Sequence, residues 1–445
     1  MKTFPIGGIH PSDCKEYSKE AAIERFPIPE VVTIPLSQHI GAPAVACVSK
    51  GDRVVVGQVI ATAGGFVSSP IHSSVSGVVK SVDMAIDAQG NPKPSITIAV
   101  EGDEWQTSVD LSPELVKSIN LSPKEIVEKI AKMGVVGMGG ATFPTHVKLS
   151  IPEGKKAECL IINAVECEPY LTADYRVMLE QGEKLLAGAR ILAKAIGVDK
   201  IYVGIENNKP DAIAHLEKLA GAYLEVEIVP LKMRYPQGGE KQLIAAITGR
   251  EVPSGKLPID VGAVVQNVGT ALAVYEAVAK NKPLVERVVT VTGSTLKEPK
   301  NLLVRIGTPI SALIDYCGGM ENVGKVIAGG PMMGRAVSNL EAPVTKGTSG
   351  VLLMPTEESL RHREGECIRC AKCVDACPMG LEPYLLSQLT QRGDYDELER
   401  HWMADCIECG CCTFSCPSYL PLLDWVRIGK AEVMKRIRER AAAKK

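Results

Sequence analysis

Eight of the 14 cysteines repeat one spacing twice between positions 367 and 416. The first run is followed by Pro378 and the second by Pro417. Three thiolates at intervals of three residues can wrap a tight loop around three corners of an iron–sulfur cubane, and the fourth iron then needs a ligand from elsewhere. The spacing therefore predicts two 4Fe-4S clusters. The cysteines of the two runs are Cys367, Cys370, Cys373 and Cys377, and then Cys406, Cys409, Cys412 and Cys416.

The distribution of these cysteines between the clusters follows from the same spacing. In two-cluster proteins of the bacterial ferredoxin type, the fourth ligand of each cluster comes from the other run. The alternative of two zinc sites is less compatible, because zinc modules use two separated C-x₂-C pairs. Cys411 departs from the spacing and is predicted to be a small packing residue. Most of the five scattered cysteines are expected to be buried apolar residues; these are Cys14, Cys47, Cys159, Cys167 and Cys317. The predicted ligand sets are Cys367, Cys370, Cys373 and Cys416 for one cluster, and Cys406, Cys409, Cys412 and Cys377 for the other.

The sequence around the two runs predicts a mainly helical domain. Leucines between the runs recur at helical spacing from Leu381 to Leu389, and a second helical stretch is expected through Leu398 and Trp402. The segment from Asp424 onward is rich in Lys and Arg. That segment is either a surface for anionic lipid or an acidic partner, or an ordinary solvated helix.

A second chemically suggestive segment is the glycine-rich loop at 137–148. It follows a helix predicted to begin at Ser122, where a Ser-Pro-Lys-Glu sequence forms a capping box. Glycines let backbone N–H groups approach an anionic or planar ligand, and Lys148 can neutralise a phosphate. The loop follows a helix rather than a strand, so it does not match the dinucleotide-binding fingerprint.

Polar residues follow the apolar strands of the middle region. The strand at 159–162 runs into Asn163, Glu166 and Glu168, and further strands are expected at 200–205 and 224–229. Strands alternating with helices predict a doubly wound α/β sheet, in which such turns bind ligands. For each turn alone, simple helix capping is the alternative interpretation. Two later turns add Glu240 and Asn267.

Residues 31–100 read as short strands rich in Val and Ile, separated by glycine turns. Their pattern resembles the flattened barrel of biotinyl and lipoyl carriers. Those carriers present a modifiable lysine at a hairpin tip, but the stretch at 64–74 contains none. A structural or docking role is therefore expected for this module, rather than a swinging arm.

The bulk composition limits the remaining possibilities. The chain has 445 residues, and its formal net charge of −2 gives no overall attraction for nucleic acid. The most apolar stretch, 261–279, is interrupted by Gln266, Asn267 and Glu276, so no transmembrane segment is predicted. The first residues lack the pattern of a secretory signal, and a cytoplasmic protein is expected.

Taken together, these segments resemble the RnfC family, which supplies one subunit of Rnf electron-transport complexes. The middle region resembles the flavin-binding NADH dehydrogenase subunit of respiratory complex I. Residues 286–350 resemble the β-grasp module that follows the flavin domain in both families. The most specific parts are the segments at 7–11, 35–43 and 137–148, the segment from Asn163, and both cysteine runs.

The expected fold is a multidomain α/β chain. The four predicted domains are an N-terminal segment with a lipoyl-like flattened β-barrel (1–110), a doubly wound α/β domain for FMN and NADH (111–285), a β-grasp module (286–355), and a mainly α-helical two-cluster ferredoxin-like domain with a basic C-terminal helix (356–445).

The resemblance also implies roles for individual residues. Val165 stands where complex I usually has an aspartate, and Gly239 replaces one of two adjacent glutamates. The residues implied around FMN are Gly137, Gly139, Gly140 and Lys148, with Asn163, Glu166 and Asn267 near its ring or phosphate. The residues implied to face the nicotinamide nucleotide are Phe143, Glu168 and Glu240.

The function implied by the resemblance is hydride exchange between NAD(H) and FMN, followed by passage of single electrons through the two clusters. The chain would be a peripheral subunit at the cytoplasmic face of the membrane. Its partners would be the other subunits of an Rnf-type complex, with ferredoxin as a candidate. One alternative is a soluble flavin-dependent corrinoid reductase, although residues 1–110 favour Rnf. A second alternative is an electron-wiring subunit without a flavin site.

Overall fold

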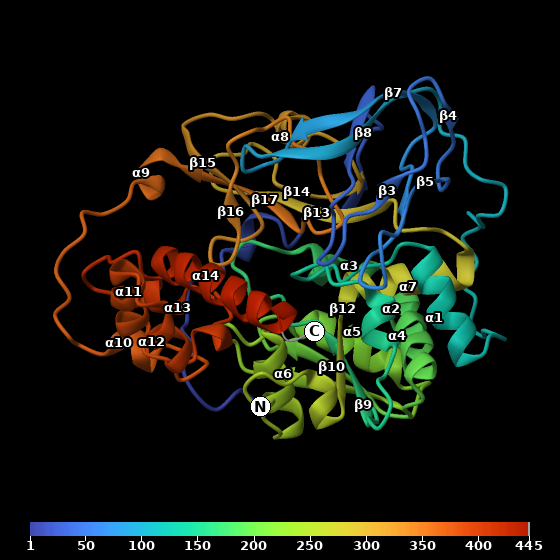
Figure 1. Ribbon diagram of the computed structural model, residues 1–445. Coiled ribbons are helices and arrows are strands. Elements are labelled where there is room, and N and C mark those ends of the chain that lie inside the picture. Colours follow the sequence, from blue (N-terminus) through green and yellow to red (C-terminus); the bar gives the residue numbers. More distant parts are fainter. Residues whose placement is uncertain (444–445) are drawn as a thin grey trace.

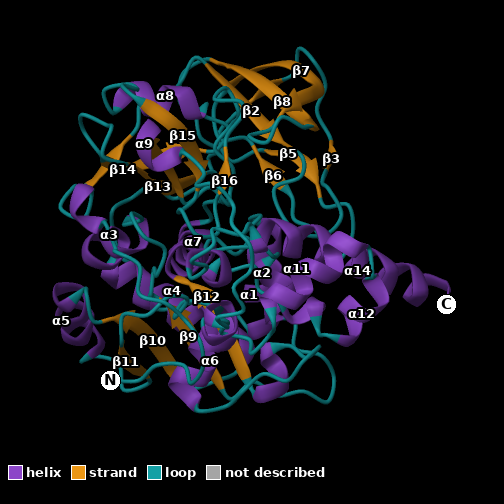
Figure 2. Cartoon of the chain, turned by 90° about the vertical axis from the view of Figure 1, so that its left-hand side faces the viewer, coloured by secondary structure: helices purple, strands orange, loops and turns teal. Residues whose placement is uncertain are grey.

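The computed structural model describes residues 1–443 and comprises four packed units (Figure 1). Two β-rich units lie side by side at the top of Figure 1, the α/β unit lies below them, and the C-terminal helices pack at the left. The view in Figure 2 shows α11, α12 and α14 beside the α/β unit. The C-terminal helices therefore lie against the α/β unit.

The N-terminal β unit is built from antiparallel pairs, as the short Val- and Ile-rich segments predict. Its sheets have the orders β2-β8-β7-β4 and β3-β5-β6. Ile34, Ile60 and Ile98 are fully buried between them. The strands are β2 (Val31–Pro35), β3 (Val45–Ala46), β4 (Arg53–Val54), β5 (Val59–Thr62), β6 (Ile71–His72), β7 (Gly77–Ile86) and β8 (Pro92–Val100).

The α/β unit has a parallel sheet of order β11-β10-β9-β12. Leu160 and Ile162 of β9 face one apolar core, whereas Cys159 and Ile161 face another. Both faces are therefore covered, and the doubly wound prediction is confirmed. The strands are β9 (Cys159–Asn163), β10 (Ile201–Glu206), β11 (Val226–Leu231) and β12 (Ala263–Asn267).

Helices surround this sheet. The predicted capping box is present, because the hydroxyl of Ser122 accepts from the N–H of Glu125 and the carboxylate of Glu125 accepts from the N–H of Ser122 at 2.7 Å. The helix α6 covers the second core, and the remaining helices of the unit contribute to the first. The helices are α1 (Pro123–Lys132), α2 (Thr145–Leu149), α3 (Ala173–Glu180), α4 (Gly182–Ile196), α5 (Pro210–Ala220), α6 (Glu240–Thr248) and α7 (Val268–Lys280).

The third unit, which corresponds to the predicted β-grasp module, is a six-stranded mixed sheet of order β1-β14-β13-β17-β15-β16 with α8 packed on it. Its edge strand β1 comes from the N-terminal segment and pairs in parallel with β14. Residues near the start of the chain therefore complete a module that is otherwise built from residues beyond 285. The elements are β1 (Ile23–Arg25), β13 (Glu286–Thr292), β14 (Lys300–Arg305), α8 (Ile310–Tyr316), β15 (Val323–Ala328), β16 (Arg335–Ala336) and β17 (Gly350–Pro355).

The C-terminal unit is helical. The predicted helix around Leu385 is α11, but the next helix ends at Arg400, and Trp402 adopts φ 59° beyond it, so that prediction is corrected by two residues. Within residues 1–443, none of the helices is sufficiently long and apolar to span a membrane. The helices are α9 (Thr356–Ser359), α10 (Lys372–Asp375), α11 (Pro383–Arg392), α12 (Tyr395–Arg400), α13 (Cys411–Phe414) and α14 (Leu422–Ala443).

Several basic side chains of α14 are paired within the protein. Arg436 and Arg440 reach the carboxylates of Asp396 and Glu399 on α12. Lys430 donates to Glu408 at 3.1 Å. These pairs reduce the charge available to an outside partner, which favours the interpretation of α14 as a packed structural helix over that of a lipid-binding segment.

Candidate cluster-binding and flavin-binding sites

The two cysteine runs adopt the same local conformation. Arg369 and Glu408, at equivalent positions, both have φ 56°, and Ala371 and Gly410 have φ 61° and 81°. A short helix, α10 or α13, follows each left-handed residue. These positive φ values curl the backbone around the cysteines, so the repeated spacing produces a repeated loop.

Four cysteines surround one apolar cavity between α11, α13 and α14. We call Cys377, Cys406, Cys409 and Cys412 the inner group; they line this cavity together with Leu381, Leu386, Leu423 and Val426. Cys411 also lines the cavity and is fully buried, as expected of a packing residue. The cavity thus joins the last cysteine of the first run to three cysteines of the second.

The other four cysteines lie toward solvent. We call Cys367, Cys370, Cys373 and Cys416 the outer group. Cys367 and Cys370 are exposed, whereas Cys373 and Cys416 are half-buried. Burial raises the pKa of Cys373, and the neighbouring thiol of Cys416 raises it further. The third cysteine of the first run therefore lies near the last cysteine of the second.

The inner group fits a cluster better than a single ion. Within residues 1–443, no three His, Cys, Asp or Glu side chains are arranged to hold one metal ion. The inner cysteines instead surround a cavity, as ligands of a larger inorganic core must. Burial raises the pKa of Cys406 to about 11 and that of Cys412 to about 12. These thiols therefore need a cationic metal group to become thiolates near neutral pH.

Of the five scattered cysteines, expected to be mostly buried, only Cys159 and Cys317 are buried. Cys14 and Cys167 are half-buried, and Cys47 is exposed. The expectation that most of them are buried is therefore wrong, most clearly for Cys47. Strand β3 is a two-residue strand at the rim of the barrel, and Cys47 follows it directly, which leaves its side chain outside the core.

The second site lies at the carboxyl end of the α/β sheet. The chain places β10 and β11 on one side of β9 and β12 on the other, so a topological switch point lies between β9 and β12. Asn163 and Asn267 end these two strands and are register partners. The amide of Asn163 donates to the carbonyl of Gly238 at 2.8 Å. The two asparagines therefore lie side by side where such sheets bind ligands.

The glycine loop lies over this strand end. The amide of Met138 donates to Thr270 at 2.9 Å, and a Cβ on Gly139 would lie only 2.7 Å from the side-chain nitrogen of Asn267. A Cβ on Gly140 would meet nothing within 4 Å. Gly137 closes the loop by donating to the carbonyl of Phe143 at 2.9 Å. The loop thus combines a close approach to Asn267 with an open outer side.

Lys148 reaches the same region from α2. Its ammonium lies 2.5 Å from the carboxylate of Glu240 and donates to the carbonyl of Val265 at 2.9 Å. Both side chains keep about a third of their surface exposed (32% and 39%). Lys148 is therefore a cation accessible from the loop, and an incoming phosphate would compete with Glu240 for it.

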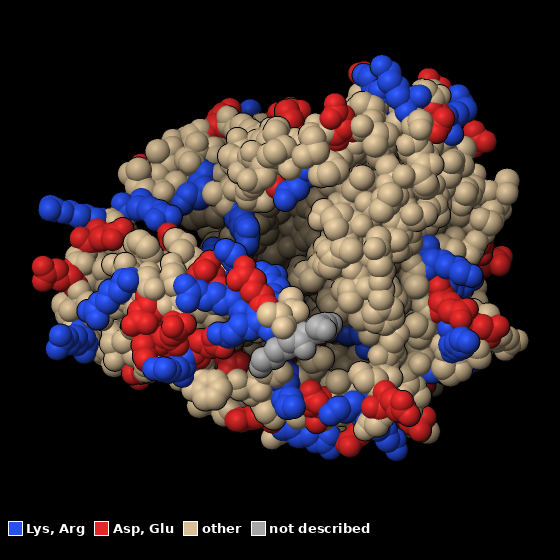
Figure 3. Space-filling view, viewed as in Figure 1, with Lys and Arg blue, Asp and Glu red and all other residues tan. Residues whose placement is uncertain are grey.

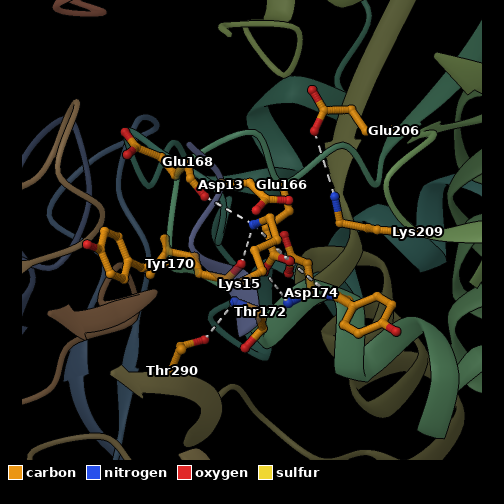
Figure 4. A network of polar contacts seen from close by, with 12 residues as sticks. Asp13, Lys15, Glu166, Glu168, Tyr170, Thr172, Asp174, Glu206, Lys209 and Thr290 are labelled. Atoms are coloured by element: carbon orange, nitrogen blue, oxygen red, sulfur yellow. Dashed lines mark hydrogen bonds and ion pairs between the residues drawn. The ribbon is translucent and has the colours of Figure 1, made fainter. Parts of the chain in front are cut away.

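Glu166 lies deeper and belongs to a buried polar network (Figure 4). Its carboxylate accepts from the N–H of Asp174 at 2.8 Å and of Tyr175 at 3.3 Å, both in the first turn of α3. Lys15, from the N-terminal segment, lies 3.9 Å away. Burial raises the pKa of Glu166 to about 7. Glu166 therefore anchors α3 beneath the site, a role that the sequence does not reveal.

A second ion pair of the network joins Lys209 and Glu206 at 3.7 Å, and each side chain is only 2% exposed. Burial lowers the pKa of Lys209 to about 8, since the uncharged amine is favoured there. Lys209 also donates to the carbonyl of Val165 at 2.8 Å. The lysine therefore fixes the backbone at the position where complex I usually has an aspartate.

Glu168 is held by the β-grasp module. Its carboxylate accepts from the N–H groups of Met332 and Met333, at 3.1 and 2.8 Å. Burial raises the pKa of Glu168. A nucleotide could reach this carboxylate only in competition with the loop at 330–334. Glu168 thus has different partners from Lys148 and Glu240, whereas Phe143 is half-buried within the glycine loop itself.

Figure 3 shows a hollow in the centre of the face drawn in Figure 1, between the helix α14 and the barrel strands β3 and β5. Lys and Arg side chains border it. The hollow thus opens between the C-terminal helix α14 and the barrel, with basic side chains at its edge.

Comparison with protein families assigns the four units. Family models match the RnfC barrel sandwich hybrid domain over residues 2–104, the Nuo51 FMN-binding domain over 130–276, the SLBB domain over 288–336 and the 4Fe-4S dicluster domain over 359–417. The fold and the sites thus define an electron-transport protein with an FMN-binding domain and a two-cluster domain.

Three relatives identify the family. The chain is 49% identical to the C subunit of the proton-translocating ferredoxin:NAD(+) oxidoreductase complex of Clostridium ljungdahlii, over 89% of this chain and 86% of the relative. It is 45% identical to the Na(+)-translocating counterpart of Acetobacterium woodii, over 96% of each. It is 43% identical to the C subunit of the ion-translocating oxidoreductase complex of Rhodobacter capsulatus, over 98% and 84%. This chain belongs to the RnfC family of Rnf-complex subunits.

The fold also occurs in a solved structure. A chain of an NAD+-reducing [NiFe]-hydrogenase in the H2-reduced state aligns over 70% of this chain and 63% of its own length, with a TM-score of 0.50 and 20% identity. At this identity the similarity concerns the fold alone.

Proposed function

We propose that this chain is the peripheral subunit of a membrane-bound, ion-translocating ferredoxin:NAD oxidoreductase at which NAD(H) enters. Its relatives carry the names of such complexes. The observation that carries the proposal is the position of the glycine loop over the switch point, where Gly139 approaches Asn267. When bound there, FMN would take two electrons and a proton from NADH and release the electrons singly to the clusters.

The residues of the switch point suit the parts of FMN. The backbone of Gly137, Gly139 and Gly140 would allow close approach of the phosphate and ring, and Lys148 would neutralise the phosphate after release from Glu240. Asn163 and Asn267 would supply amide groups toward the ring or phosphate by exchanging their present acceptors, the carbonyl of Gly238 and the carboxylate of Asp174. Glu166 would act beneath the site by holding the first turn of α3.

Phe143, Glu168 and Glu240 are proposed to face the nicotinamide nucleotide. Phe143 offers an aromatic surface for a base, and the carboxylates of Glu168 and Glu240 suit ribose hydroxyls. Both carboxylates have partners in the present structure, Met332 and Met333 for Glu168 and Lys148 for Glu240. We therefore propose that nucleotide binding exchanges these partners.

We propose that the inner and outer groups each bind one 4Fe-4S cluster. The inner group packs against the α/β unit, whereas the outer group includes the two exposed cysteines. Electrons would therefore pass from the flavin to the inner cluster, then to the outer cluster, and on to another protein of the complex or to ferredoxin. The chain would lie at the cytoplasmic face of the membrane. Domain boundaries near residues 110, 285 and 355 would separate its four domains.

The proposal is tested by anaerobic titration of the full chain with NADH after its iron and FMN have been quantified. We expect flavin bleaching followed by the EPR signal of reduced clusters. Gly139→Ala should weaken FMN binding about tenfold or more, because its Cβ would overlap Asn267. Gly65→Ala is the control, since its Cβ would meet only Ala42 at 3.8 Å.

Two outcomes would overturn the proposal. Full iron without FMN or response to NADH would make the chain an electron-wiring subunit. Reduction of a corrinoid protein in place of ferredoxin-linked activity would support the corrinoid reductase alternative.

A further inference from the structure

Tyr235 connects the flavin-site segment to the inner group. Its hydroxyl donates a hydrogen bond of 2.8 Å to the carbonyl oxygen of Cys409. A few residues further along the same segment, Gly238 accepts from Asn163 and Glu240 pairs with Lys148. One short stretch of chain therefore touches the proposed flavin site at one end and a proposed cluster ligand at the other.

The ring of Tyr235 is held firmly. It is 2% exposed and packs with Ile9, Ala376, Cys409 and Cys411. The backbone of Tyr235 also exchanges two hydrogen bonds with Ile9, of 2.8 and 2.9 Å. The N-terminal segment thereby fixes the tyrosine from behind, so that the hydroxyl has a defined position.

Two further contacts hold the inner group against the other units. The side chain of Gln242 on α6 donates to the carbonyl of Pro378 at 3.2 Å. From the β-grasp module, Met332 packs beside Gly410, whose Cβ would lie 3.0 Å from the carbonyl oxygen of Met332. Among these contacts, only Tyr235 bonds directly to the backbone of an inner cysteine while also belonging to the segment that leads to the flavin site.

We propose that Tyr235 is a positioning residue for electron transfer: by holding the Cys409 peptide, it sets the placement of the inner cluster relative to the flavin. The inference rests on the proposed function and deepens it. Each electron would leave the reduced flavin and lower the charge of the inner cluster by one, so no further reactant is required. Tyr235 acts through Cys409 and is not itself oxidised or reduced.

The test is Tyr235→Phe in the full chain, which removes the hydroxyl and keeps the ring. Three properties are compared with wild type: the EPR spectrum and midpoint potential of the inner cluster, the rate of flavin bleaching by NADH, and the rate of the following cluster reduction by stopped flow. Tyr202→Phe, on strand β10, is the matched control. Iron content, FMN content and thermal midpoint are measured for all three proteins.

We expect Tyr235→Phe to shift the inner-cluster spectrum and potential and to slow cluster reduction roughly twofold to tenfold, the factor equivalent to one hydrogen bond. Flavin bleaching, cofactor content and the outer-cluster spectrum should match wild type. An unchanged spectrum, potential and transfer rate would overturn the inference. A general loss of cofactor and a slower bleaching step would also overturn it, because they would indicate a merely structural role.

The inference and the proposed function can fail separately. If wild type binds no FMN, the proposed function fails, but the dithionite-reduced inner cluster still reports on Tyr235 through its spectrum and potential. If wild type behaves as proposed and Tyr235→Phe is identical to it, only the inference fails.

Discussion

The two cysteine runs have the same spacing and the same loop conformation, yet the inner and outer groups that they form have opposite surroundings. Cys409 of the inner group is 7% exposed and packs beside Tyr235, whereas Cys370 of the outer group is exposed. In the proposed assignment, the repeated sequence determines how a cluster is ligated. Packing against the other units determines what each cluster contacts.

The difference has an electrochemical consequence. Solvent exposure and hydrogen bonds to the ligands tune the potential of an iron–sulfur cluster. The inner group touches three other parts of the chain, through Ile9, Tyr235 and Met332. The chain next to the outer group is held within the C-terminal unit, for instance by the hydrogen bond from the N–H of Gly365 to the carbonyl oxygen of Ser418. Two clusters of the same type should thus differ in potential, and the inner one is suited to accept electrons from the flavin.

The largest expected effect comes from removing one ligand from each group. Cys409→Ala should abolish the inner cluster and with it the reduction of the outer cluster by NADH, because the path is interrupted. Cys370→Ala should leave the inner cluster reducible. Each variant should lose roughly half of the iron, since a cubane holds four irons. Iron analysis and EPR during NADH titration measure both effects.

Equal behaviour of these two variants would remove the distinction between an inner and an outer cluster. Dithionite reduction of both variants is the control. If dithionite still reduces the remaining cluster, the C-terminal domain is folded and only the electron path from NADH is interrupted.

A smaller effect is expected at Gly7, where the N-terminal segment meets the inner group. Gly7 has φ +66°, and an added Cβ would lie 2.3 Å from the carbonyl oxygen of Cys377. Gly197 has φ +69° with open space around it. Both alanine variants should lose about 1–2 kcal/mol of stability from the backbone conformation. Only Gly7→Ala should also change the EPR spectrum of the inner cluster.

The outer-cluster spectrum is the internal reference for this pair. A local effect on the inner group would be contradicted if Gly7→Ala changed the spectra of both clusters. It would also be contradicted if Gly197→Ala changed the spectrum of the inner cluster.

The smallest effect on the inner cluster is expected at Glu166, whose protonation changes the stability of the chain instead. Burial raises its pKa from 4.5 to about 7, so the folded chain keeps a proton that the unfolded chain loses over this range. The stability that this proton provides is full below the unfolded pKa and lost as the pH rises through the folded pKa. Relative to Glu166→Gln, the wild type should therefore lose about 1–3 kcal/mol between about pH 5 and about pH 8.

The measurement is the difference in thermal midpoint between wild type and Glu166→Gln across this pH range. A constant difference would mean that Lys15, 3.9 Å away, keeps Glu166 ionised throughout. Glu240→Gln is the control, because its carboxylate lies at the surface of the same unit and is 39% exposed.

The sequence predicted much of this fold for identifiable physical reasons. The capping box at Ser122 and the leucines around Leu385 are local signals, so the helices α1 and α11 follow from neighbouring residues alone. The expected strands at 200–205 and 224–229 appear one or two residues later, at Ile201–Glu206 and Val226–Leu231. Strand ends depend on register with neighbouring strands, which local patterns do not contain.

By itself the sequence determined the cysteine spacing, the glycine loop and the residues at the strand ends, because these patterns are short in sequence. Only the tertiary structure decided that β1 completes a sheet formed by residues beyond 285, that Met332 and Met333 engage Glu168, and that Tyr235 binds the Cys409 peptide. These contacts join residues more than a hundred positions apart. The packing of whole units decides which residues make these contacts, and a local sequence pattern does not contain that information.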